Sequence, residues 1–151
     1  MKKVSDIFKR KGTQNISIDI TAPVLEALKL MADKNIGSVV VMCENHYRGL
    51  FTERDYARKV ILHGKNSSEL TVGEVMSEYL PKVGLNTSSE ECMEIMSNHN
   101  IRYLPVFESD NYIGVISIID VVKEEITEQK NQIEDLQNYI HSARYFFLFF
   151  L

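Results

Sequence analysis

The chain has 151 residues, which suffices for one ordinary domain or two very small ones and excludes a full (β/α)₈ barrel of about 250 residues. Its 44% hydrophobic and 25% charged residues are typical of a globular protein with a buried core rather than of a disordered tail. The net charge of −4, from 17 basic and 21 acidic residues, indicates no nucleic-acid partner, because phosphate neutralisation needs a clustered basic surface.

The N-terminal segment is predicted to contain a short helix at residues 4–7, which resemble the short capped helix expected at residues 71–76. Basic residues at 9–11 follow before an apolar segment can form, which argues against a secretory signal. Cys43 and Cys92 lack C-x-x-C spacing, so neither a zinc site nor a disulfide framework is indicated and a reducing compartment fits. We therefore expect a cytoplasmic protein.

Residues 16–62 show the patterns of one β-α-β-β-α unit. Residues 16–20 alternate like a half-buried strand, and apolar residues then recur at helical spacing until Gly37, which is expected to end the helix. Residues 39–51 predict a hairpin around a polar turn. Thr52 then has the side chain of an N-cap, with Asp55 at the third position of a helix that reaches residue 62.

Residues 83–126 predict the same order of elements again. A strand is expected at Val83 and Leu85, followed by a helix around residues 92–96, a hairpin of residues 104–116 and a helix over residues 120–126. Pro105 indicates an edge position or an irregularity in its strand, because proline donates no hydrogen bond to a ladder.

An internal repeat relates the two units. A shift of 65 positions aligns residues 31–55 with residues 96–120 without a gap. Since about 60 residues are marginal for an isolated domain, we expect the two copies to share a buried interface. The identical pairs are Met31 and Met96, Asn35 and Asn100, Ile36 and Ile101, Val41 and Val106, Tyr47 and Tyr112, Gly49 and Gly114, and Asp55 and Asp120.

Beyond the second unit, apolar residues continue at Ile126, Ile133, Leu136 and Ile140, separated by seven, three and four positions. This approximates heptad spacing and predicts an amphipathic helix, whose apolar stripe must be covered by its own domain or by a partner. The apolar run 145–151 is too short to span a membrane, so no transmembrane segment is expected. Its role is left open between packing across a dimer, contact with a membrane surface, and no function.

The chemical motifs of metal sites and enzymes are not evident in the sequence. The four histidines have no ligand spacing, so no metal site is expected. No motif pairs a nucleophile with a base, and catalysis is therefore not expected either.

The two hairpins and the residues that follow them resemble the paired CBS domain, named after cystathionine β-synthase and also called the Bateman module. The matching stretches are residues 36–41 with 49–55 and residues 101–106 with 114–120. The resemblance covers roughly residues 4–140, and the chain departs from stand-alone bacterial relatives by its apolar tail. It is specific because order, spacing and duplication all agree.

The resemblance implies two α/β units with two clefts between them that bind adenine nucleotides such as AMP, ATP or NAD, and a flat homodimer of such pairs. In the family, the hydroxyl residue and the aspartate of G-x-x-[ST]-x-x-D contact ribose and phosphate. This places Thr52 and Asp55 in one cleft and Ser117 and Asp120 in the other.

General chemistry is compatible with these roles. A carboxylate can accept hydrogen bonds from both ribose hydroxyls, and a helix start with free N–H groups favours phosphate. The same residues also suit plain helix caps, and only the duplicated context favours ligand binding. The remaining candidate contacts are the backbone of Ile36, Gly37 and Ser38 for the purine edge, Arg54 and Arg102 for the phosphates, and Tyr103 and Pro105 of the second matching stretch.

The two arginines are not duplicated. Arg102 stands where the first copy has Gly37, and Arg54 stands where the second copy has Ile119. If they point into different clefts, two ligands are expected; if they converge, one polyphosphate site is favoured.

The sequence thus predicts an α/β (α+β) protein of tandem β-α-β-β-α repeats packed as a pseudo-twofold pair, with a C-terminal amphipathic helix. Each repeat includes its leader helix, over residues 1–66 and 67–126, and the helix with its apolar tail takes residues 127–151. The expected function is non-enzymatic sensing of an adenine nucleotide, without a required cofactor, by a homodimer that acts on an unknown effector protein. The alternative is a protein-protein interaction module with vestigial clefts.

Overall fold

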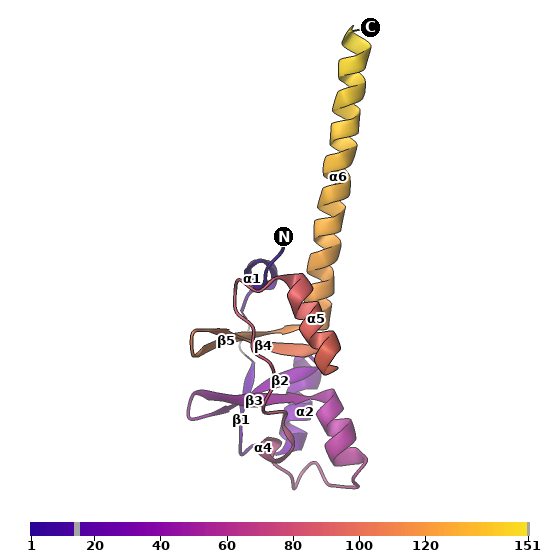
Figure 1. Cartoon of the computed structure of the whole chain (residues 1–151). Coiled ribbons are helices and arrows are strands. Elements are labelled where there is room, and N and C mark those ends of the chain that lie inside the picture. Colours follow the sequence, from indigo (N-terminus) through magenta and orange to yellow (C-terminus); the bar gives the residue numbers. More distant parts are fainter. Residues whose placement is uncertain (14–15, 151) are drawn as a thin grey trace.

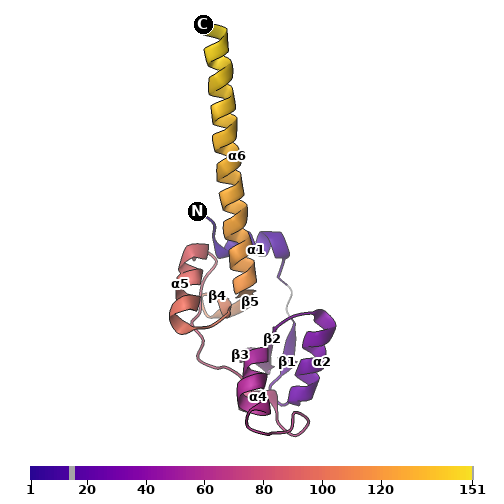
Figure 2. The ribbon, with the colours of Figure 1, turned by 90° about the vertical axis from the view of Figure 1, so that its right-hand side faces the viewer.

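In the computed structural model, which describes residues 1–13 and 16–150, two small α/β units lie one above the other (Figure 1). A long C-terminal helix projects from the second unit (Figure 2). This architecture confirms the expected fold class of two mixed α/β repeats followed by a helix.

The first unit is a three-stranded sheet in the order β1-β2-β3, with one face covered by a helix. Strand β1 (Ser17–Asp19) is parallel to β2 (Ser38–Cys43), and β2 forms the expected hairpin with β3 (His46–Thr52). The helix α2 (Val24–Lys34) buries Val24, Ala27 and Met31 against the sheet.

The second unit repeats this arrangement with one strand fewer. Helix α5 (Ser89–His99) precedes the hairpin of β4 (Tyr103–Glu108) and β5 (Asn111–Ser117). The strand expected at Val83 and Leu85 is reduced to a single parallel bridge between Val83 and Val106.

Two prolines and a helix explain the missing strand. A parallel ladder extended towards the N-terminus would join residue 81 to the N–H of residue 105, yet both positions are proline and donate no hydrogen bond. On the other side, the carbonyl of Leu85 accepts from the backbone N–H of Ser5 instead. The bridge therefore keeps only the bonds Val83 N–H to Pro105 O, at 3.1 Å, and Phe107 N–H to Val83 O, at 2.8 Å.

Asparagine ends the helix before each hairpin. Asn35 after α2 and Asn100 after α5 both have φ of 52°, in the left-handed region that closes a helix. The expectation that Gly37 ends the first helix is therefore wrong, because Asn35 fills that position two residues earlier. The repeat aligns Asn35 with Asn100, and this identity is the signal in the sequence that could have located both helix ends.

The helix that follows β3 begins as expected and continues differently. Thr52 is its N-cap, and Asp55 completes a capping box from the third position of α3 (Glu53–Asp55). The next residues form a π-helix, η1 (Tyr56–Ile61), rather than a continued α-helix. Such π segments occur often at functional sites.

The two leader helices pack on the opposite repeat. Helix α1 (Val4–Lys11) buries Val4 and Ile7 in the core of the second unit, whereas α4 (Val72–Val75) buries Val72 and Val75 in the core of the first. In the sequence each leader helix directly precedes one repeat, but in the structure it packs against the other repeat. This exchange ties the units together.

Aromatic side chains join the two sheets where their hairpins meet. The rings of Tyr47 and Tyr112 are stacked with centroids 5.1 Å apart, and Phe107 meets Tyr47 edge-on at 5.2 Å. These contacts form part of the shared interface that the repeat predicted.

Helix α6 (Ile118–Phe150) is a single helix of 33 residues. Its base packs against α1 and α5, where Val121 and Glu124 are buried and Arg10 Nε lies 3.1 Å from Glu124 Oε1. Within the described residues, no helix combines the length and apolarity needed to cross a membrane. The side chains of residues 145–147 and 149–151 lie outside the described part of the structure. The expectations for the apolar tail concern these residues and therefore stay predictions.

Candidate functional site

Two of the pockets between the repeats are each built from a turn of one unit and a helix cap of the other. The Asp120 pocket combines residues 35–38 of the first unit with Ser117, Ile119 and Asp120 of the second. The Asp55 pocket combines residues 99–103 of the second unit with residues 52–55 of the first. Each has a volume of about 360 Å³, within the range of small-molecule sites. The pseudo-twofold therefore generates two related but chemically different sites.

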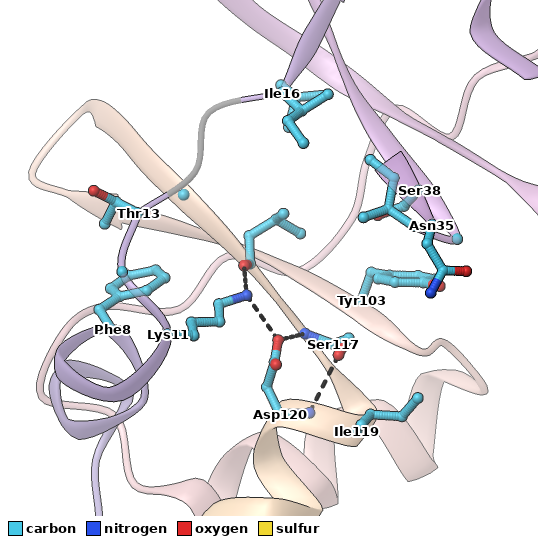
Figure 3. Close-up of a pocket in the computed structure, with 16 residues that line it drawn as sticks. Phe8, Lys11, Thr13, Ile16, Asn35, Ser38, Tyr103, Ser117, Ile119 and Asp120 are labelled. Atoms are coloured by element: carbon cyan, nitrogen blue, oxygen red, sulfur yellow. Dashed lines mark hydrogen bonds and ion pairs between the residues drawn. The ribbon is translucent and has the colours of Figure 1, made fainter. Parts of the chain in front are cut away.

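The end of α1 forms one side of the Asp120 pocket (Figure 3). Phe8 and Thr13 lie on one side of it, and Ile16 and Asn35 on the side of the first unit (Figure 3). Lys11 provides the cation of this pocket, and its Nζ lies 2.8 Å from Asp120 Oδ2 and 2.9 Å from the carbonyl oxygen of Val115. The pocket thus pairs one cation with one carboxylate among mostly apolar walls.

Asp120 is held ionised by its neighbours. Its Oδ2 also accepts from the backbone N–H of Ser117 at 2.8 Å, and Ser117 Oγ accepts from the N–H of Asp120 at 3.2 Å. Partial burial raises the pKa of Asp120, but the bonds from Lys11 and Ser117 and the charge of Lys11 outweigh it, so the pKa lies below its ordinary value. Asp120 therefore acts as an acceptor that is already partly occupied.

The Asp55 carboxylate is buried and already has four donors. Oδ2 accepts from the N–H and the hydroxyl of Thr52, both at 3.0 Å. Oδ1 accepts from Ser77 Oγ at 2.8 Å and lies 3.0 Å from Lys59 Nζ. A carboxylate has about four acceptor positions, so a ligand hydroxyl must replace one of these donors. Lys59 is the exchangeable one, because it is half exposed and also bonds the carbonyl of Val75.

Arg54 and Arg102 converge in the Asp55 pocket. Arg54 Nη1 donates to the carbonyl oxygen of Asn100 at 2.7 Å, which fixes its guanidinium across the boundary between the units. Arg58 and Lys59 line the same pocket, so four cationic side chains face two carboxylates, those of Glu53 and Asp55. The Asp55 pocket is therefore suited to a polyanion, unlike the Asp120 pocket.

Gly37 and Tyr103 form the wall that the two pockets share. The Tyr103 hydroxyl lies directly against Gly37, where a Cβ atom would overlap it. Close approach, rather than a left-handed φ, favours glycine here, because a Cβ atom would force the Tyr103 side chain to shift. A movement of Tyr103 would change both pockets together.

The structure distributes the sequence-predicted site residues between the pockets. Ile36, Ser38, Ser117 and Asp120 line the first, Thr52, Arg54, Asp55 and Arg102 line the second, and Gly37 and Tyr103 line both. Pro105 is buried within β4 and does not belong to either lining.

Sequence reasoning missed two site residues near the C-terminal ends of the leader helices. Lys11 at the end of α1 contacts Asp120, and Ser77 just after α4 contacts Asp55. The basic residues 9–11 were visible as a cluster, but only the exchange of leader helices shows which carboxylate they reach. Lys59 was equally hidden, although it lies one helical turn after Asp55.

Comparison with known proteins agrees with this geometry. The family model described as CBS domain matches the chain twice, at residues 4–61 and 72–126. A mitochondrial CBS domain-containing protein of Arabidopsis thaliana, CBSX3, is 34% identical over 151 residues, covering 93% of this chain and 72% of its own length. The CBS domain-containing protein YhcV of Bacillus subtilis is 28% identical, covering 83% and 89%.

Solved structures with CBS domains have the same fold. One from Burkholderia ambifaria is 38% identical with a TM-score of 0.81, and the match covers 85% of this chain and 96% of the other. Another from Agrobacterium tumefaciens is 32% identical with a TM-score of 0.77, and the match covers 81% and 98%.

Proposed function

Because this chain belongs to the CBS-domain family, whose paired members are generally regulatory, we propose that it is a non-enzymatic module that binds an adenine nucleotide between its two repeats. The bound nucleotide shifts the geometry of a homodimer, and a separate effector protein responds to that shift. The two cysteines, Cys43 and Cys92, are unpaired, which suits the cytoplasmic location expected from the sequence.

The observation that carries the proposal is the convergence of Arg54 and Arg102 on the Asp55 pocket. Guanidinium groups bind phosphates through planar pairs of donors, and Arg58 adds a third such group at the rim. Of the AMP, ATP and NAD class, this charge favours ATP at the Asp55 pocket. The Asp120 pocket, with Lys11 already paired to Asp120, is the weaker site.

Residues of the Asp55 pocket have separate roles in binding the nucleotide. Asp55 accepts from one ribose hydroxyl when Lys59 leaves Oδ1, and the released ammonium moves to the phosphates. Thr52 holds the carboxylate in place through its capping box. The backbone around Ile101 and Tyr103 lies where the purine edge is read, as residues 36–38 do in the Asp120 pocket.

The energy available for signalling is modest but adequate. A ligand at 100 times its dissociation constant stabilises the bound state by about 2.7 kcal/mol, which suffices to shift an equilibrium between two arrangements. Both pockets lie between the repeats, so a bound nucleotide contacts both units at once.

Thermal unfolding with AMP, ATP, NAD and S-adenosylmethionine tests the proposal. We expect ATP to raise the melting temperature most, and the combined changes Arg54→Gln and Arg102→Gln to abolish that increase. Arg48→Gln is the matched control, because Arg48 is exposed on β3 and lies outside both pocket linings. The absence of any shift with all four compounds rejects nucleotide sensing and favours the alternative, an interaction module with vestigial clefts.

A further inference from the structure

Helix α6 carries an exposed apolar stripe along one face. Isoleucine recurs at every seventh position, and the side chains of Ile119, Ile126, Ile133 and Ile140 are 61%, 46%, 56% and 59% exposed. Val122 and Leu136, each three positions after an isoleucine, are also exposed. This is the a/d pattern of a coiled coil, with isoleucine at each of these a positions.

Apart from Ile119, which lines the Asp120 pocket, the stripe faces away from the protein's own body. Val121 and Glu124, which are buried where α6 packs on α1 and α5, lie at the c and f positions, on the side of the helix opposite to a and d. Beyond residue 128, α6 projects free of both units (Figure 2). A second helix can therefore reach the stripe from Ile126 onward without meeting the two repeats.

We infer that α6 pairs with α6 of a second copy of this chain in a parallel two-stranded coiled coil. Isoleucine at a with leucine at d favours two parallel strands, and Leu136 occupies a d position. Gln129 is the polar residue at the d position between Val122 and Leu136. A long helix without an apolar partner is poorly stable in water, which this pairing remedies.

One flanking charge pair, together with the basic e positions, favours the parallel orientation. In a parallel pair, each g position faces the e position of the following heptad on the partner helix, so Glu125 faces Lys130 of the second copy. Glu125 also accepts a hydrogen bond from Ser89 Oγ, which holds it at the edge of the stripe. In an antiparallel pair, e positions face each other, and these are basic at Lys123, Lys130 and Arg144. Like charges then oppose association.

The first test measures self-association of the full chain by analytical ultracentrifugation. Ile133→Asp combined with Ile140→Asp places two charges inside the stripe, and we expect the dimer dissociation constant to rise at least about tenfold. The matched control is Asn131→Asp with Asn138→Asp, which adds the same charge at f positions outside the stripe and leaves the constant unchanged. An equal effect of both pairs, or no effect of either, overturns the inference. Both isoleucines are exposed, so the repeats stay folded, and an unchanged thermal unfolding transition checks this.

The second test determines orientation. In a parallel pair, residue 129 faces itself, so Gln129→Cys forms a disulfide-linked dimer on oxidation, whereas the parent chain with its two cysteines does not. Gln132→Glu with Gln137→Lys places opposite charges in register only in a parallel pair, and we expect tighter association. Weaker association and no cross-link overturn the parallel arrangement.

These outcomes do not depend on the nucleotide proposal. Loss of association with retained ATP binding supports the coiled coil alone, whereas retained association without any nucleotide response rejects only the proposed function.

Discussion

The ammonium group of Lys11 lies 2.8 Å from Oδ2 of Asp120, although the two residues are 109 positions apart in the chain. The pair forms because α1 packs on the second repeat instead of the first. It connects the N-terminal helix to the cap of α6 and places a cation inside the Asp120 pocket (Figure 3). A helix that looks like a simple leader in the sequence is thus part of a candidate binding site.

Asp120 makes stability depend on pH in the acid range. Its pKa is lower in the folded chain than the ordinary value of 3.8, so its contribution is present above that value and is lost as pH falls through the folded pKa. We expect Asp120→Asn to lower stability at pH 7 by roughly 1 kcal/mol, or about 2–4 °C, after screening by solvent. The difference between parent and variant then shrinks below pH 3.8 in thermal unfolding. A difference that is constant with pH contradicts this assignment, and Asp33→Asn, at an exposed site on α2, is the control.

Arg102 is predicted to distinguish phosphate from nucleoside. If its guanidinium contacts phosphate oxygens in the Asp55 pocket, Arg102→Gln weakens ATP binding by about tenfold or more, since a hydrogen bond to a charged group is worth about 1.5–3 kcal/mol. Adenosine binding, which involves no phosphate, changes little. Isothermal titration calorimetry with both compounds measures the two effects, and an equal loss for ATP and adenosine contradicts the phosphate role.

A side chain at position 37 is predicted to destabilise the protein while Tyr103 keeps its hydroxyl. Gly37→Ala places a Cβ atom on the Tyr103 hydroxyl, and we expect a loss of about 1–3 kcal/mol in the free energy of unfolding. Adding Tyr103→Phe removes the overlapping atom and restores most of the loss. Gly84→Ala is the control, because its Cβ atom would meet Phe107 O at an ordinary 3.7 Å. Denaturant unfolding of the four proteins gives the result, and a double variant as unstable as Gly37→Ala excludes this contact as the cause.

The two stacked tyrosines hold unsatisfied hydroxyl groups. Among the described residues, neither Tyr47 Oη nor Tyr112 Oη has a hydrogen-bond partner, and burial raises the pKa of Tyr47 to about 12. A buried hydroxyl without a partner costs free energy, so Tyr47→Phe is expected to stabilise the protein by about 1 kcal/mol. Tyr139→Phe, at a 74% exposed position, changes nothing. A loss of stability on Tyr47→Phe shows that the hydroxyl is bonded to water.

Local patterns predicted the parts of the fold that local physics determines. Thr52 and Ser117 were identifiable as helix starts, because a hydroxyl followed three positions later by an aspartate suits a capping box. The duplicated hairpins followed from the 65-residue repeat. Gly37 was misread as a helix end, whereas its close approach to Tyr103 is what favours a glycine there.

Long-range packing determined what the sequence could not predict. The positions of Lys11 and Ser77 depend on which repeat each leader helix covers, and both choices preserve the same hydrophobic pattern. Arg54 and Arg102 belong to different repeats, so whether they share a pocket depends on how the two units are stacked. The long range of these relationships explains why the sequence left the number of ligands open.

Helix α6 runs without a break from the Asp120 pocket to the far end of the helix at Phe150. The helix begins beside Ser117, whose hydroxyl accepts from the N–H of Asp120, and then runs for 33 residues. At 1.5 Å per residue it is about 50 Å long, so a tilt of about 5° at its base displaces its far end by about 4 Å. If a ligand in the Asp120 pocket tilts the base of α6, the helix acts as a lever arm that turns the small tilt into a movement of several ångströms at its far end.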